Sequence, residues 1–145
     1  MAKSFVAEQT YYLAAPPSRV FRYLVEPELL VKWFLSDARL TPKKGGPFTF
    51  DWIGGYRMES QILTYEGGRA VSFAWKDKLP NGRVAITRAA FRVTKKSKGT
   101  LLKLRHSGFT VPAHFAECSS RWAYYLMNLK SVIEHRQDLR SPFDW

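Results

Sequence analysis

The hydrophobic pattern of this chain changes its period at Pro112, and that change constrains the fold more than any other feature. Upstream, apolar residues alternate with polar ones, as at Phe48 and Phe50, which is typical of strands with one buried face. Downstream, apolar residues from Phe115 to Ile133 recur at three- and four-residue steps, which predicts one long amphipathic helix over residues 113–137. A sheet and a single long helix must therefore share one core.

Turn signals divide the alternating region into strands. Gly54-Gly55, Gly67-Gly68 and Asn81-Gly82 are dipeptides favoured in tight turns, and residues 94–99 form a lysine-rich turn. Strands that are joined by short turns pair antiparallel, and a sheet of many strands curls because each strand twists.

Two prolines shape the segment between the first predicted strand, residues 4–13, and the later ones. Proline is favoured in the first turn of a helix, so Pro17 and Pro27 each predict the start of a short helix. The whole order predicts an α+β helix-grip fold, in which a curved antiparallel sheet wraps around a long C-terminal helix. We expect a single domain over residues 1–145, with the aromatic tail 143–145 able to pack back on the sheet.

Short motifs follow one another along the chain in a characteristic order. They are Ala15-Pro16-Pro17, Val20-Phe21, Pro27-Glu28, Trp33-Phe34, Gly45-Gly46-Pro47-Phe48 and the segment Gly99–Phe109 with its Leu102, Leu104 and His106. In this order they resemble the START-like (birch-pollen-allergen-like, SRPBCC) superfamily, in the branch named for the activator of heat-shock-protein-90 ATPase homologue. The chain departs from the branch pattern at Arg121-Trp122, where relatives have Gly-Trp.

The resemblance implies a sheet that grips the helix around an apolar cavity, but it leaves several functions open. We favour a module that binds an apolar, lipid-like or aromatic small molecule between the sheet and the C-terminal helix. The first alternative is a co-chaperone-like protein-interaction domain. The second is a cofactor-free enzyme of the cyclase or hydrolase type, which no catalytic motif in the sequence supports.

His106 and Glu59 are the polar residues expected at the ligand site. His106 shares a strand face with Leu104, so alternation turns it inward, where it could orient a ligand or transfer a proton. The alternative is a structural histidine held by hydrogen bonds. Glu59 would anchor a ligand if it points inward and pair with an arginine such as Arg57 if it points outward, and the alternation of its strand leaves both orientations open.

Aromatic side chains are the candidates for the apolar wall, since ligand sites are mostly apolar with a few polar anchors. The candidates are Trp33, Phe48, Phe50, Trp75, Phe91 and Trp122. Any one of them could instead be ordinary core, and the sequence does not separate the two roles.

The charge of the chain bears on its partners. Lys and Arg number 23 against 12 Asp and Glu, a net charge of +11. The basic residues are scattered apart from the turn at 94–99, which fits a solvated surface or an acidic protein partner better than a nucleic-acid groove. We therefore do not expect nucleic acid as a partner.

Other functional classes lack their sequence signatures. His106, His114 and His135 stand far apart and Cys118 is the only cysteine, so the sequence shows no metal-ligand spacing and allows no internal disulfide. The glycine pairs sit in hairpin turns, where no helix start follows to hold a phosphate. We expect no cofactor, no membrane span and a cytoplasmic location.

Overall fold

The computed structural model describes residues 3–141. Its elements follow the predicted order of one strand, two short helices, further strands and a long helix. They are β1 (Phe5–Leu13), α1 (Pro17–Val25), α2 (Pro27–Leu30), β2 (Asp37–Leu40), β3 (Pro47–Asp51), β4 (Arg57–Glu66), β5 (Ala70–Lys78), β6 (Val84–Lys96), β7 (Gly99–Phe109) and α3 (Pro112–His135). The expected packing of residues 143–145 lies outside the described part of the chain.

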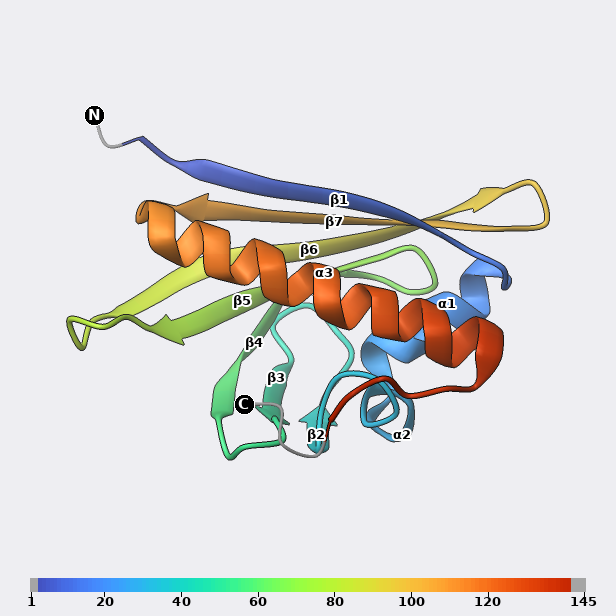
Figure 1. Cartoon of the computed structure of the whole chain (residues 1–145), viewed down its shortest axis with the longest axis horizontal. Coiled ribbons are helices and arrows are strands. Elements are labelled where there is room, and N and C mark those ends of the chain that lie inside the picture. The colour runs from blue at the N-terminus through green and yellow to red at the C-terminus, as the bar shows by residue number, and fades with distance from the viewer. Residues whose placement is uncertain (1–2, 142–145) are drawn as a thin grey trace.

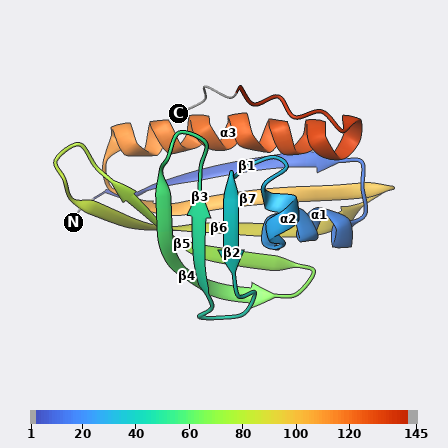
Figure 2. The ribbon, with the colours of Figure 1, turned by 90° about the horizontal axis from the view of Figure 1, so that it is seen from below.

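The strands form one antiparallel sheet in the order β1-β7-β6-β5-β4-β3-β2. Every neighbouring pair except β1 with β7 is consecutive in the chain, as the turn dipeptides predict. In Figure 2, β2 and β3 run across the direction of β1 and β7, which shows how strongly the sheet curls. The helix α3 lies along the concave side of this sheet (Figures 1 and 2), so the helix-grip prediction is confirmed.

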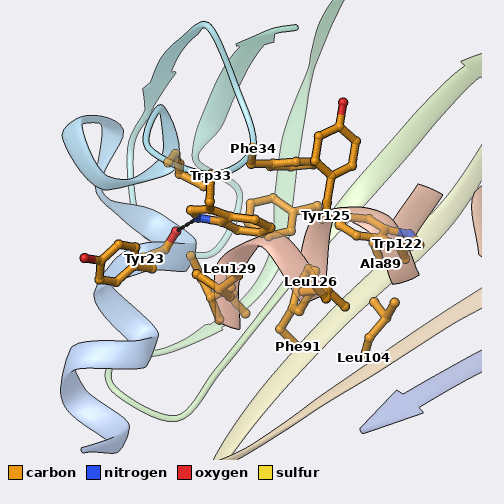
Figure 3. Close-up of a cluster of buried hydrophobic side chains, with 14 of the residues drawn as sticks. Tyr23, Trp33, Phe34, Ala89, Phe91, Leu104, Trp122, Tyr125, Leu126 and Leu129 are labelled. Atoms are coloured by element: carbon orange, nitrogen blue, oxygen red, sulfur yellow. Dashed lines mark hydrogen bonds between the residues drawn. The ribbon is translucent and has the colours of Figure 1, made fainter. Parts of the chain in front are cut away.

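The two short helices close one end of the curled sheet. Pro17 and Pro27 occupy the first helical turns of α1 and α2, where the missing backbone N–H costs no hydrogen bond. The helix α1 packs against β6 and β7. The indole of Trp33 then donates a 2.9 Å hydrogen bond to the backbone carbonyl of Tyr23, which fastens the segment after α2 to α1 (Figure 3).

An aromatic cluster fills the space between this end of the sheet and α3 (Figure 3). Phe34 stacks on Trp33 with ring centroids 4.8 Å apart and meets Tyr125 of α3 edge-on at 5.0 Å. Phe50 of β3 and Phe91 of β6 are also buried in the cluster. Large side chains thus fill one half of the hollow that the curl creates.

Within residues 3–141, no helix combines the length and the apolar character that a membrane crossing requires.

Candidate functional site: a cavity between β5 and α3

A cavity of about 390 Å³ opens where the last residues of β5 face the first half of α3. This region is at the left of Figure 1. The turn between β3 and β4 and the loop after β5 complete its walls. Aromatic side chains form much of the lining, namely Phe34, Trp52, Tyr56, Trp75, Trp122 and Tyr125. The polar lining includes Asp77, Lys78, His114, Glu117, Cys118 and Arg121.

Three aromatic rings separate this cavity from the filled core. Trp75 and Trp122 lie 5.1 Å apart between centroids, and Phe34 packs against both at 6.1 and 5.4 Å. The same three residues line a second void of about 10 Å³ on the core side. That void is apolar and too small for a ligand, so of these two hollows the cavity beyond the rings is the candidate site.

A compact polar cluster lies next to these rings, farther toward the end of β5 and the start of α3. Asp77 comes from the end of β5, while His114 and Cys118 stand four residues apart on α3 and therefore share one helix face. Because a carboxylate only accepts hydrogen bonds, His114 Nε2 donates to Asp77 Oδ2 at 2.8 Å, and Cys118 Sγ donates to the same oxygen at 3.5 Å. The cluster is nearly dry: His114 and Cys118 are 7% and 4% exposed.

Burial and the charge of Asp77 keep Cys118 of the cluster and the neighbouring Tyr56 protonated. Burial, and after it the negative charge of Asp77, raises the pKa of the Cys118 thiol well above its usual range. Burial and the same carboxylate raise the pKa of Tyr56, whose hydroxyl donates to the backbone carbonyl of Lys76 at 2.8 Å. Cys118 is therefore a poor nucleophile here, since the thiolate is the reactive form.

His106 points inward as its strand pattern predicts, but it does not line the cavity. Trp122 Nε1 donates to its Nδ1 at 2.9 Å, so Nε2 carries the hydrogen and donates to Thr87 Oγ1 at 2.6 Å. Both ring nitrogens are thus occupied by protein. Burial, with a smaller effect from His114, lowers the pKa of His106 to about 3, so the ring is neutral near pH 7.

Comparison with known proteins identifies the family of this chain and solved structures with a similar fold. The family described as "Activator of Hsp90 ATPase homolog 1-like protein" matches residues 14–134. The chain belongs to this family. No curated protein matches the sequence.

Solved structures show the same fold at low sequence identity. Protein SSP2350 from Staphylococcus saprophyticus is 17% identical with a TM-score of 0.81, over 94% of this chain and 97% of that one. The Aha1 dimer from Colwellia psychrerythraea is 20% identical with a TM-score of 0.77, over 90% and 97% of the two chains. DynU16, a protein in the dynemicin biosynthetic locus, is 16% identical with a TM-score of 0.82, over 94% of this chain and 50% of that one. At these identities the likeness establishes the fold alone.

In this family member, the residues proposed from sequence, apart from His106, separate into three groups. Trp75 and Trp122 line the cavity. Trp33, Phe48, Phe50 and Phe91 are buried in the aromatic core and do not line it. Glu59 is exposed and points away from the interior, because its neighbour Met58 takes the inward position on β4. Of the two orientations that the sequence left open for Glu59, the structure has the outward one, away from the cavity.

The polar cluster at Asp77 escaped the sequence analysis, although one signal was present. His114 and Cys118 have the four-residue spacing that places two side chains on one helix face. The wide sequence separation of the three histidines hides this pair, because one of its members is a cysteine. Asp77 has no local signal, because its proximity to α3 depends on how the sheet curls around the helix.

Proposed function

We propose that the protein binds a flat aromatic or apolar small molecule with a polar edge in the cavity between β5 and α3. The observation that carries this proposal is the cavity itself. Its volume of about 390 Å³ is within the range of small-molecule sites, about 300–1,000 Å³. Its lining combines aromatic walls with a few converging polar groups, which is the usual composition of such sites.

The aromatic and polar parts of the lining indicate how a ligand would lie. Trp75 and Trp122 offer ring faces and edges against which a flat apolar body can pack. Beyond these rings, toward the end of β5 and the start of α3, Asp77 and His114 offer polar atoms for the edge of the ligand. A ligand that lacks any polar edge would remove the water that still reaches the Asp77 carboxylate, which is 14% exposed, without replacing it, and this disfavours purely aliphatic compounds.

The first test is mass spectrometry of the purified protein under native and denaturing conditions. A mass adduct that is present in the native spectrum and lost on denaturation identifies a bound compound directly. An apo mass calls for titration with an environment-sensitive aromatic dye, 1-anilinonaphthalene-8-sulfonate. A cooperative thermal transition and an intact near-ultraviolet circular dichroism spectrum then show that the dye meets folded protein.

A pair of variants on α3 tests the location. Ala113 lines the cavity, whereas Ala116 is exposed on the same helix outside it. Ala113→Phe should obstruct the cavity and weaken dye binding about tenfold or more, a change of ~1.4 kcal/mol or more. Ala116→Phe adds the same side chain elsewhere and should leave binding unchanged. Equal effects of the two variants would place the dye outside the cavity.

Family membership and the net charge of +11 support a second candidate, a protein-interaction domain with an acidic partner. Charge complementarity of this kind acts mainly on the association rate, which falls as salt is added. Pull-down from lysate at low and high salt, with identification of acidic proteins lost at high salt, tests it. A pull-down without any salt-sensitive partner would contradict this candidate and leave the cavity proposal unaffected.

A further inference from the structure

We propose that Asp77, His114 and Cys118 form a binding site for a divalent transition-metal ion, with Zn²⁺ as the best chemical match. The inference goes beyond ligand binding, because it stands on the polar cluster and needs no organic ligand. It also goes against the expectation from the sequence, in which no metal-ligand spacing is evident.

The geometry of the three donor atoms carries the proposal. His114 Nε2, Cys118 Sγ and an Asp77 carboxylate oxygen all lie within 4.8 Å of one another. Asp77 Oδ2 lies 2.8 Å from His114 Nε2 and 3.5 Å from Cys118 Sγ. In a tetrahedral zinc site with bonds of about 2.0–2.3 Å, donor atoms are about 3.3–3.8 Å apart. Small side-chain rotations therefore suffice to bring the three atoms onto one face of a tetrahedron.

The scaffold holds these donors in place from two directions. His114 and Cys118 project from one face of α3, and Asp77 projects toward them from the end of β5. All three are buried or nearly so, with the Asp77 side chain 14% exposed, so their rotamers are restricted by packing. Because all three also line the cavity, the fourth coordination position would face the cavity, as in zinc sites that keep one position for water or a ligand.

The charges and ligand types favour Zn²⁺ over Mg²⁺ or Ca²⁺. Thiolate and imidazole are ligands for zinc and related transition metals, whereas Mg²⁺ and Ca²⁺ prefer oxygen ligands alone. On binding, Cys118 loses its thiol proton to solvent and the imidazole of His114 moves its hydrogen from Nε2 to Nδ1. A carboxylate, a thiolate and a neutral imidazole then balance the charge of a 2+ ion, with one proton released per ion.

The single cysteine of the chain makes the test specific. Untagged full-length protein would be titrated with Co²⁺, which occupies tetrahedral zinc sites and absorbs visible light there. A thiolate-to-cobalt charge-transfer band in the near ultraviolet can come only from Cys118. We expect this band to saturate at one ion per chain and to disappear when Zn²⁺ is added, with one proton released per ion bound.

Four variants separate a metal site from the hydrogen-bonded cluster alone. Cys118→Ser should abolish the charge-transfer band. His114→Ala should weaken Zn²⁺ binding by at least about tenfold, since loss of a direct ligand costs no less than loss of an outer-shell partner. Asp77→Asn keeps the size of the side chain and should also weaken binding. His135→Ala removes an exposed histidine elsewhere on α3 and should change nothing.

Two results would overturn the proposal. One is the absence of a Cys118-dependent band at stoichiometric Co²⁺ in protein whose cooperative thermal transition shows it to be folded. The other is equal Zn²⁺ affinity in the wild type and His114→Ala. Either result leaves the cluster as an Asp77 carboxylate held by two hydrogen bonds. The ligand cavity is tested by dye binding to the wild type and Ala113→Phe, which needs no metal ion. Failure of the metal site and failure of the ligand cavity are therefore distinguishable.

Discussion

Trp122 of α3 and His106 of β7 are joined by a 2.9 Å hydrogen bond from the indole Nε1 to the imidazole Nδ1. The chain of bonds continues from His106 Nε2 to Thr87 of β6, so it ties the helix to two strands of the sheet. His106 is completely buried, and neither of its nitrogens can reach the cavity. The bond fixes the ring of Trp122 in the cavity wall.

Replacing His106 should therefore cost folding stability. His106→Leu leaves the buried indole N–H of Trp122 without an acceptor, and an unpaired buried polar group costs about 1–3 kcal/mol. With the change in packing added, we expect a loss of about 2–4 kcal/mol in the free energy of unfolding, measured by urea denaturation. Arg105 lies on the same strand as His106 and forms an exposed ion pair with Glu8 of β1. Arg105→Gln removes this pair and should cost less than about 1 kcal/mol. Equal losses would contradict the assigned role of His106.

The same histidine should make stability depend on pH. Its pKa falls from 6.5 to about 3 on folding, so between these values the unfolded state binds a proton that the folded state does not. Stability is then fully present above about pH 6.5 and falls by up to about 1.4 kcal/mol per pH unit as the pH drops toward 3. Carboxylates titrate below about pH 5, so the clean window is about pH 5–6.5.

Urea denaturation across that window, in the wild type and in His106→Gln, isolates this effect. The variant keeps hydrogen-bonding atoms but does not titrate, so other titrating groups contribute equally to both proteins. We expect the wild type to lose stability more steeply with falling pH. Parallel pH profiles would show that His106 does not resist protonation in the folded state.

The fold and the candidate site differ in how far local sequence determines them. Alternation and turn dipeptides are local signals, and they predict the strands and the change to a helix at Pro112 without tertiary information. The inward direction of His106 follows from the same alternation, because Leu102 and Leu104 share its face. At Glu59 the local pattern is mixed, so only packing of Met58 in the core decides the orientation.

Local sequence signals could not predict which half of the hollow is open and which is filled by side chains. Which half is filled depends on the rings of Phe34, Trp75 and Trp122, which meet from three separate segments. The polar cluster likewise joins residues 41 positions apart, Asp77 and Cys118. Such contacts follow from the three-dimensional path of the chain and leave no periodic trace in the sequence.

Cys118 should react slowly with thiol reagents in the folded protein. Its side chain is 4% exposed, and burial together with Asp77 raises the pKa of the thiol, so little thiolate forms at neutral pH. We expect alkylation by iodoacetamide at about pH 7.5 to be at least about tenfold slower than in urea-unfolded protein, because both access and ionisation are reduced. Mass spectrometry measures the rate. Alkylation at equal rates in the two states would show that the cluster opens readily.

Folding stability should also depend strongly on Asn128 in α3, because its side chain binds two separate segments. Its Nδ2 donates to the carbonyl of Trp33 and to Asp138, both at 2.9 Å, and its Oδ1 accepts from the amide of Leu139 at 2.6 Å. Asn128 is 1% exposed, so truncation leaves several buried partners unpaired. Asn128→Ala should lower the free energy of unfolding by about 2–4 kcal/mol.

The exposed neighbour Met127 provides the control for this prediction. Its side chain is 50% exposed, so Met127→Ala should change stability by no more than about 0.5 kcal/mol. Hydrogen exchange gives a second readout, since the amide of Leu139 loses its acceptor only in the Asn128 variant and should exchange faster there. A stable Asn128→Ala protein with a protected Leu139 amide would mean that other contacts hold the segment after α3. The ion-paired Arg140, which donates to the carbonyl of Val31 at 2.8 Å, would then be the next residue to replace.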